Sequence, residues 1–309
     1  MSSALPPDVV RNIVEIFGAR GERWLGELPA VLRGLCATWG LVQVGAPMTG
    51  GTHSWVAPVR RADGSLAVLK IPVRDPENAG EAAGLHWYGG DGAVRLYDFD
   101  PGSGALLLEY ARPGTPLLPQ PETPLEGLPE NAGRVRLACD LLRRLRRAPG
   151  ELPDGYPPLP TVADVVAEWS AWLTGPAAAV LDPPLRSRAR DRCAELAEPD
   201  GPLLVVNRDN HLGNIVAAER EPLLLIDPKP YLGEAAFDAG FLVLIQVASA
   251  PGADQARRVT TRTADALGVG ARRARSWAFL RAVEEVAWAV EDDRPADRDR
   301  NLAIAAALR

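Results

Sequence analysis

The chain has few of the residues that build disulfides and transition-metal sites. Its 309 residues include three cysteines and three histidines. Cys36, Cys139 and Cys193 are odd in number, widely spaced and form no CxxC pair, so we expect reduced, buried thiols in a cytoplasmic protein. The histidines show no zinc-ligand spacing, which argues against a transition-metal site.

Long apolar runs and a basic balance are also missing. No segment approaches the roughly eighteen apolar residues of a membrane span, and the first residues, MSSALPPDVV, lack the features of a secretory signal. The net charge of -6 argues against a nucleic-acid surface. We interpret the one basic cluster as the solvated face of a helix; it comprises Arg143, Arg144, Arg146 and Arg147. We therefore expect no nucleic-acid or membrane partner. Nothing in the pattern requires an oligomer, so we expect a monomer.

One stretch, LLVVNRDNHLGNIV followed by AAEREP and LLLIDPKP, carries the residues of a kinase catalytic loop. Two short apolar runs each end in a polar loop, the first with Asp209 and Asn214 and the second with Asp227. A kinase places its catalytic carboxylate and its two magnesium ligands in this order. Each residue alone would be an ordinary turn former. Their spacing between apolar strands instead predicts Asp209 as the base and Asn214 and Asp227 as Mg²⁺ ligands.

A lysine upstream completes this pattern. Lys70 ends the apolar run AVLKIPV, and a lysine buried there is costly without a partner. We expect it to bind the phosphates of a nucleotide and to pair with Glu81, or as second choice Glu77, both on a helix predicted over 76–88. No GxxxxGK[ST] loop occurs, which excludes a P-loop NTPase.

Further nucleotide contacts are expected from two other segments. Glycines and hydroxyls in the turn MTGGTHS can approach phosphate oxygens, although Gly-Gly turns between strands are common. The segment LLLEYARPG is expected to offer backbone groups to the nucleobase. The residues assigned to these contacts are Gly50, Gly51, Thr52, Ser54, Glu109 and Ala111.

The order of elements predicts an α+β fold with two lobes. A small antiparallel sheet with one main helix against it should come first, and a mostly helical lobe should follow. A proline-dense stretch after Ala111 separates a nucleotide-binding lobe (1–111) from a catalytic and substrate-binding lobe (112–309). Strands are predicted over 41–47, 54–59, 66–72, 93–100 and 105–111, and helices over 24–40, 76–88, 162–173, 237–248, 254–267 and 271–291, with a short one at the C-terminus.

Several segments together resemble the aminoglycoside phosphotransferase family, and within it the streptomycin 6-kinase and hydroxyurea phosphotransferase group. They are GERWLGELPAVLRG, ADGSLAVLK, GGDGAVRLYDFD, LLLEYA, NRDNHLGNIVAAEREPLLLIDPKPYLGEAAFD and LAIAAAL. The resemblance implies a bilobal protein-kinase-like fold and transfer of a nucleotide's γ-phosphate to a hydroxyl of a small molecule. It puts the catalytic aspartate on Asp209, the metal ligands on Asn214 and Asp227, and the phosphate-anchoring lysine on Lys70.

The chain departs from the family pattern beside the catalytic aspartate. The family usually has a histidine two residues earlier, where this chain has Asn207, followed by Arg208; Asn210 replaces the usual leucine. In the family, that histidine mainly braces the two catalytic loops by hydrogen bonds. An asparagine offers both a donor and an acceptor, so we expect Asn207 to form such a brace. Asp238 is expected to tie the loop to the next helix, and His211 to be structural.

The acceptor is expected near Asp209, against the segment AVEEVAWAVEDDRP. Carboxylates on one helical face would bind the ammonium or guanidinium groups of an aminoglycoside; the alternative is a solvated acidic face beside a packed tryptophan. The residues assigned to this site are Glu284, Trp288, Glu291 and Asp292.

We therefore predict a magnesium-dependent enzyme that phosphorylates an antibiotic, an aminoglycoside of streptomycin type, with ATP or GTP as donor. One alternative acceptor is a nucleoside antibiotic or hydroxyurea. Another alternative is a nucleotide-binding pseudokinase. Such a protein would be expected to lack one of four key residues, but all are present: Lys70, Asp209, Asn214 and Asp227.

Overall fold

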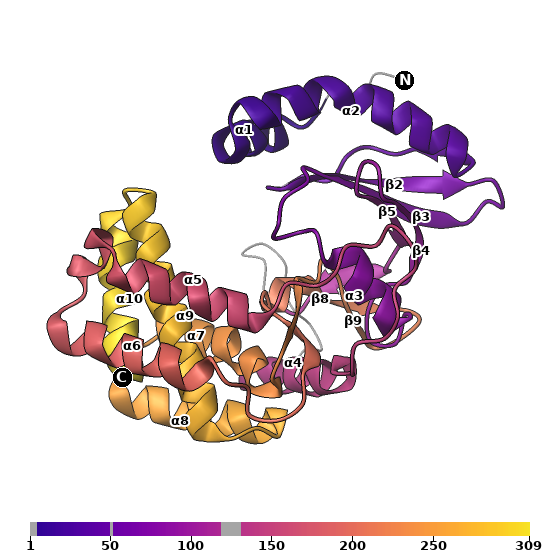
Figure 1. Cartoon of the computed structure of the whole chain (residues 1–309). Coiled ribbons are helices and arrows are strands. Elements are labelled where there is room, and N and C mark those ends of the chain that lie inside the picture. The colour runs from indigo at the N-terminus through magenta and orange to yellow at the C-terminus, as the bar shows by residue number, and fades with distance from the viewer. Residues whose placement is uncertain (1–4, 50–51, 119–130) are drawn as a thin grey trace.

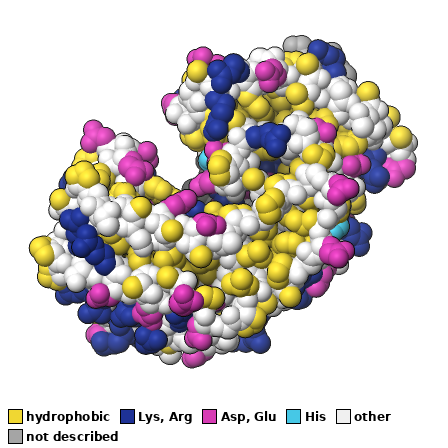
Figure 2. Space-filling model, viewed as in Figure 1, with side chains coloured by type: hydrophobic (Ala, Val, Ile, Leu, Met, Phe, Trp, Pro, Cys, Tyr) yellow, Lys and Arg dark blue, Asp and Glu magenta, His cyan; other side chains and the backbone are white. Residues whose placement is uncertain are grey.

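A computed structural model describes residues 5–49, 52–118 and 131–309, with side chains from residue 133 in the last range. The chain forms a sheet-based lobe and a mostly helical lobe (Figure 1). Figure 2 shows a deep hollow between them on one side of the molecule. The two-lobed α+β architecture agrees with the prediction.

The N-terminal lobe is built on a five-stranded antiparallel sheet in the order β1-β2-β3-β5-β4. Alternate strand residues such as Ala57 and Leu69 face α2 and bury Leu28 and Leu35 of that helix. The helix predicted over 24–40 is therefore present, but it begins earlier, and α1 before it was not anticipated. Proline is tolerated at the first helical position, so α1 can begin at Pro7. The bounds are α1 Pro7–Phe17, α2 Ala19–Thr38, β1 Leu41–Val44, β2 Ser54–Arg61, β3 Leu66–Pro72, α3 Glu81–Tyr88, β4 Leu96–Asp100 and β5 Ala105–Glu109.

The helix expected over 76–88 is shorter than predicted, because α3 begins at Glu81. The preceding residues form turns, closed by Asn78, whose side-chain amide donates to the Val73 carbonyl at 2.8 Å. The prediction that Glu77 and Glu81 share one helical face was wrong for this reason.

The C-terminal lobe packs its helices around α9, which buries Trp277 and Phe279 in the core. The helices predicted in this lobe are present with similar bounds, except that the C-terminal helix, expected to be short, has 14 residues. Helix α6 was not anticipated, because its apolar positions at helical spacing lie among arginines. The helices are α4 Asn131–Leu145, α5 Val162–Thr174, α6 Pro183–Leu196, α7 Ala239–Ala248, α8 Ala253–Leu267, α9 Ala271–Glu291 and α10 Pro295–Leu308, with short 3₁₀ helices η1 Pro176–Val180, η2 Leu212–Asn214 and η3 Ala235–Asp238.

Two small antiparallel sheets hold the predicted catalytic loops. Strand β7 (Leu204–Asn207) pairs with β10 (Pro230–Gly233), and β8 (Ile215–Ala218) pairs with both β9 (Leu223–Leu225) and β6 (Pro113–Pro116). Asp209 therefore follows β7, and Asp227 lies between β9 and β10. The Val94 N–H donates to the Leu225 carbonyl at 3.0 Å, which joins this hairpin to the N-terminal lobe.

The prediction of a solvated arginine face is wrong for two of its four residues, Arg146 and Arg147. Helix α4 ends at Leu145, so the next two residues turn inward. The Arg146 guanidinium pairs with the buried Asp238 at 2.7 Å. Arg147 donates to the carbonyls of Trp87 (2.8 Å) and Tyr88 (3.1 Å) at the end of α3.

Two further sequence expectations concern the thiols and the bilayer. Cys139 and Cys193 are buried, Cys36 is half-buried, and all three are free. Within the described ranges, no helix combines the length and apolarity that crossing a bilayer requires.

Candidate active site

Lys70 joins the two lobes at the centre of the candidate site. Its ammonium lies 2.6 Å from Glu81 Oε2 of α3 and 2.7 Å from Asp227 Oδ1 of the catalytic hairpin. Lys70 is 6% exposed and Glu81 1%. A buried ammonium is stable only with such partners. The structure therefore brings together the predicted Lys70–Glu81 pair and one of the predicted metal ligands.

The three charges shift one another's pKa values. Burial raises the pKa of Glu81 to about 7, and the Asp227 charge acts in the same direction against the attraction of Lys70. Burial acts to raise the pKa of Asp227, but Lys70 and Lys229 outweigh it and hold that pKa below its usual value. Burial likewise acts to lower the pKa of Lys70, but Asp227 and Glu81 hold it above its usual value. The two lysines thus favour the ionised form of Asp227, while burial favours the protonated form of Glu81 by raising its pKa.

The hairpin places Asn214 beside Asp227. The Ile226 N–H donates to the Asn214 carbonyl at 2.8 Å, so the two loop ends are held side by side. Asp227 has a φ of 48°, a left-handed conformation that aspartate adopts more readily than most residues. In the described ranges no group of three or more His, Cys, Asp or Glu residues is placed to hold a metal. One carboxylate and one carboxamide instead fit Mg²⁺, which completes its sphere with phosphate oxygens and water.

Asp209 lines the same cavity as Lys70, Asn214 and Asp227, a space of about 550 Å³ between the lobes. Its side chain is 26% exposed, and His211 Nε2 lies 3.9 Å from its Oδ2. His211 itself accepts a hydrogen bond from the Gly213 N–H at 3.0 Å and so caps η2, in keeping with a structural role. The Asp209 carboxylate is thus accessible from the cavity between the lobes.

A buried hydrogen-bond network supports the catalytic loop. Asn207 Oδ1 accepts from the Lys229 N–H at 2.7 Å, so the expected brace between the two loops is present. The Asn207 N–H donates to Asp238 Oδ1 at 2.9 Å, and Asn210 donates to the Asn207 carbonyl at 2.8 Å. Asp238 therefore ties the loop to α7, as expected. Its partner Arg146 was missed, because helical spacing alone placed that residue in solvent.

The other predicted nucleotide contacts lie around the same cavity, as far as they are described. Thr52, Ser54, Glu109 and Ala111 line it, whereas Gly50 and Gly51 fall outside the described residues. The Glu109 carboxylate accepts two hydrogen bonds of 2.8 Å from Arg220. Its backbone N–H donates to the Arg95 carbonyl at 2.9 Å. That N–H is therefore not available to a nucleobase.

A neighbouring cavity of about 380 Å³ lies between α5 and α9, beside the catalytic loop. Glu284, Trp288 and Glu291 line it as predicted, but Asp292 does not; it is exposed at the end of α9 and pairs with Arg294 at 2.9 Å. Glu77 lines both cavities, so the two spaces adjoin.

Glu284 is not free to bind a ligand. Its carboxylate pairs with both Arg208 and Arg281. The Arg208 guanidinium also donates to the Tyr231 hydroxyl at 2.9 Å and lies over the Trp288 ring, 5.8 Å from its centroid. Arg208 thus fixes α9 against the catalytic loop, a role that the sequence did not reveal because the two residues are 76 positions apart.

Helix α5 supplies the lining residues that the sequence reasoning missed. Glu168 and, from α9, Glu291 make no ion pair with any residue that the structure describes. The buried indole nitrogens of Trp169 and Trp172 have no hydrogen-bond partner. A buried N–H donor is costly when unpaired, so these groups fit a ligand with oxygen acceptors and positive charge. The sequence predicted only a helix over 162–173 here, with no role for these tryptophans.

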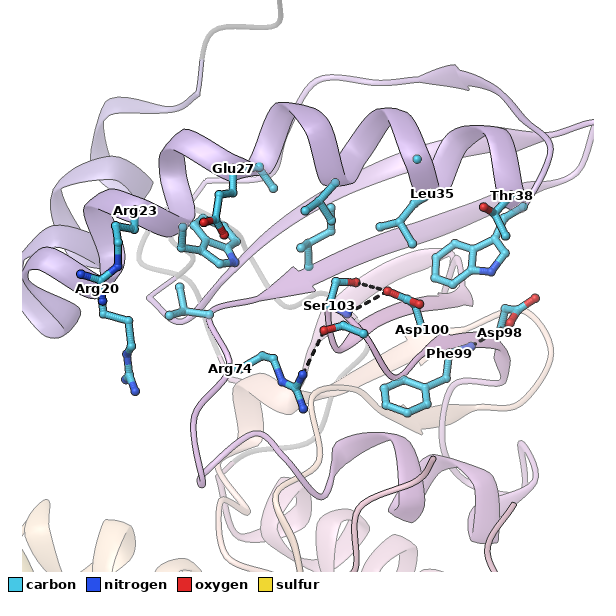
Figure 3. A pocket seen from close by; sticks show the side chains of 18 residues that line it. Arg20, Arg23, Glu27, Leu35, Thr38, Arg74, Asp98, Phe99, Asp100 and Ser103 are labelled. Carbon is cyan, nitrogen blue, oxygen red and sulfur yellow. Dashed lines mark hydrogen bonds between the residues drawn. The ribbon is translucent and has the colours of Figure 1, made fainter. Parts of the chain in front are cut away.

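Figure 3 shows a different cavity of about 790 Å³, between α2 and the outer side of the sheet. Arg20 and Arg23 lie at one end, and Asp98 and Thr38 at the other. It contains none of the predicted site residues and opens on the opposite sheet face from Lys70. The candidate active site is therefore the cleft between the lobes.

A lysine–glutamate pair in a sheet lobe, opposite an Asp, Asn and Asp on a helical lobe, defines a phosphotransferase of the protein-kinase-like fold. A family model described as aminoglycoside/hydroxyurea antibiotic resistance kinase matches residues 38–293. The chain belongs to this family. It is accordingly a phosphotransferase with an alcohol group as acceptor.

Relatives in this family cover nearly the whole chain. A hydroxyurea phosphotransferase of Kitasatospora aureofaciens is 34% identical over 98% of this chain and 85% of its own length. A streptomycin 6-kinase of Streptomyces glaucescens is 31% identical over 99% of this chain and 97% of its own. The family prediction is confirmed.

Solved structures with low sequence identity confirm the fold. A choline kinase from Streptococcus pneumoniae aligns with a TM-score of 0.59 at 11% identity, covering 92% of this chain and 99% of its own. An aminoglycoside phosphotransferase in complex with ADP and hygromycin B aligns with a TM-score of 0.58 at 13% identity, covering 90% and 97%.

Proposed function

We propose that the protein transfers the γ-phosphate of ATP or GTP, with Mg²⁺, to a hydroxyl of a cationic aminoglycoside of streptomycin type. The observation that carries this proposal is the convergence of Lys70, Glu81, Asp209, Asn214 and Asp227 on one cavity. These groups come from both lobes and supply every polar role of a phosphoryl-transfer site.

On the donor side, Lys70 would bind the α- and β-phosphates, oriented by Glu81. The Asn214 carboxamide oxygen and the Asp227 carboxylate would hold Mg²⁺, which supplies positive charge to the phosphate oxygens when bound. Asp209 would take the proton of the acceptor hydroxyl. The hydroxyl oxygen then bonds to the γ-phosphorus, the bond to the bridging oxygen breaks, and the nucleoside diphosphate leaves.

On the acceptor side, the adjoining cavity would hold the antibiotic. Glu168 and Glu291 offer carboxylates to guanidinium or ammonium groups, and the indole N–H groups of Trp169 and Trp172 can donate to sugar oxygens. Streptomycin carries guanidinium groups and many hydroxyls, which match these partners. Relatives with either acceptor have similar identity to this chain, so identity alone does not choose between the acceptors. The charged lining of the cavity favours streptomycin.

Hydroxyurea is the second candidate acceptor, favoured by the 34% identity to a hydroxyurea phosphotransferase. It is small and uncharged, and would need neither carboxylate of the acceptor cavity. The two candidates therefore differ in whether Glu168 and Glu291 matter.

We also propose that residues 1–111 form the nucleotide-binding lobe and 112–309 the catalytic and acceptor-binding lobe. Strand β6, just after this boundary, pairs with β8 of the catalytic hairpin and not with the five-stranded sheet. This pairing supports the division.

The test is phosphate transfer, followed by mass spectrometry. The purified chain is incubated with Mg²⁺ and ATP or GTP, together with streptomycin, a nucleoside antibiotic or hydroxyurea. Asp209→Asn, checked for folding by circular dichroism and for nucleotide binding, is the control. A gain of one phosphate on streptomycin that Asp209→Asn loses supports the proposal. Transfer only to hydroxyurea or the nucleoside replaces the acceptor, and nucleotide binding without transfer favours the pseudokinase.

A further inference from the structure

Five arginines from three helices line a cavity of about 330 Å³ on the far end of the helical lobe. It lies where α6, α8 and α9 meet the last residues of the chain. Figure 2 shows dark blue side chains gathered along the lower left edge, over α8 and near the C-terminus of Figure 1. No lining residue is an aspartate or glutamate. The arginines are Arg188, Arg192, Arg257, Arg272 and Arg275, and Arg309 also lines the cavity.

The surrounding carboxylates do not balance this charge. Glu195 is shared between Arg192 and Arg272, and Asp254 pairs with Arg257. Two carboxylates thus serve three of the five arginines.

The other two arginines have no aspartate or glutamate partner in the part of the chain that the structure describes. Arg188 is exposed and makes no ion pair there. Arg275 donates to the Leu308 carbonyl (2.8 Å) and to a backbone oxygen of Arg309, the last residue given (2.6 Å). Burial lowers the pKa of Arg275, and its arginine neighbours lower it further, in keeping with a positive potential that nearby acids do not cancel.

A buried hydroxyl in the same cavity lacks a partner. Thr260 of α8 is 3% exposed, and its Oγ1 makes no hydrogen bond. The hydroxyl of Ser276, by contrast, donates to the Arg272 carbonyl at 3.2 Å. Buried polar groups are rarely left unpaired. The Thr260 hydroxyl is therefore an independent sign of a ligand that accepts hydrogen bonds.

We propose that this cavity is a second ligand site, which binds a phosphate-type oxyanion carrying at least two negative charges. Guanidinium groups bind such oxygens in pairs and remain charged when partly buried. The cavity is at the small end of ligand sites, which suits a diphosphate or the phosphates of a nucleotide. It shares no lining residue with the active-site cavities. The site therefore does not depend on the proposed acceptor.

The test is calorimetric titration of inorganic pyrophosphate into the full chain carrying Lys70→Met, which removes the phosphate anchor of the active site. We expect one pyrophosphate per chain. Adding Arg188→Gln should weaken binding about tenfold, through loss of a charge-assisted hydrogen bond. Adding the isosteric Thr260→Val should weaken it about fivefold. Arg33→Gln, an exposed arginine on α2, is the matched control and should change nothing.

Three outcomes would overturn the proposal: no binding of pyrophosphate to the Lys70→Met chain, unchanged affinity in both Arg188→Gln and Thr260→Val, or an equal loss in Arg33→Gln. ATP is titrated in the same background to distinguish two sources of the anion. Competition with pyrophosphate would identify nucleotide phosphates as ligands, and pyrophosphate binding without competition would assign the site to a free oxyanion.

Discussion

The side-chain oxygen of Asn207 accepts a hydrogen bond of 2.7 Å from the backbone N–H of Lys229. This bond, together with that from the Arg208 N–H to the Lys229 carbonyl at 2.9 Å, joins the loop of Asp209 to the loop of Asp227. Asparagine thus provides the brace for which the family usually uses histidine. The two catalytic loops are thus joined by hydrogen bonds despite the departure from the family pattern.

Removing this brace should reduce both stability and rate. In Asn207→Ala, the Lys229 N–H loses its acceptor in a partly buried place, which costs about 1–3 kcal/mol of unfolding free energy. The loops of Asp209 and Asp227 lose their tie, so we expect kcat to fall about tenfold. Urea denaturation and steady-state kinetics measure the two effects. Asn207→His, which can also accept the bond, should recover most of the rate; wild-type kcat in Asn207→Ala would refute the brace.

The pH dependence of stability should report on Glu81. Its pKa is raised by burial from 4.5 to about 7, so the folded protein binds this proton more tightly than the unfolded chain. The contribution of Glu81 to stability is therefore full below pH 4.5 and is lost as the pH rises towards about 7. We expect Glu81→Gln to flatten the fall of the unfolding free energy across this window, measured by urea denaturation at several pH values.

The same titration should appear in the kinetics. Only ionised Glu81 pairs with Lys70 as a charge, so kcat/KM for the nucleotide should rise as the pH passes about 7 and lose this step in Glu81→Gln. Glu77→Gln is the matched control, because Glu77 pairs with Lys229 and not with Lys70. A step of wild-type size in Glu81→Gln would assign the titration to another group.

The carboxylates of the acceptor cavity should govern the affinity for a cationic acceptor. Glu168→Gln and Glu291→Gln each remove a charged partner, so we expect KM for streptomycin to rise about tenfold. KM for the nucleotide should stay unchanged, because neither residue lines the nucleotide cavity. Asp292→Asn, whose side chain lies outside the acceptor cavity, is the control and should behave as wild type. Equal effects of all three changes would speak against this cavity.

The buried pair of Arg146 and Asp238 should be a major source of stability. Arg146→Met leaves the Asp238 carboxylate buried without its charge partner, which costs about 3–5 kcal/mol of unfolding free energy at pH 8. Burial already raises the pKa of Asp238, and loss of Arg146 raises it further. The cost should therefore shrink as the pH falls and Asp238 is protonated.

Urea denaturation at pH 8 and pH 5 measures this change. Arg144→Met is the control, since Arg144 is 43% exposed in its ion pairs and its loss should cost under about 1 kcal/mol. The same loss at both pH values in Arg146→Met would show that packing, and not charge, dominates.

The sequence by itself determined the features that depend on local spacing. The interval from Asp209 to Asn214, the strands on either side of Asp227 and the apolar periods of α5, α8 and α9 follow from backbone geometry, which repeats every few residues. The position of Lys70 at the end of an apolar strand likewise implied a buried charge that needs a partner. These patterns were sufficient to predict the two-lobed fold and the family.

Only the tertiary structure decided which distant groups meet. It showed that Arg146 turns inward to Asp238, that Glu284 is neutralised by Arg208, and that α6, α8 and α9 converge their arginines around Thr260. Helical spacing says which side chains share a face but not what covers that face. The packing of whole elements decides which charges meet across 76 or 92 residues of sequence. A charge needs a partner only where this packing removes it from water.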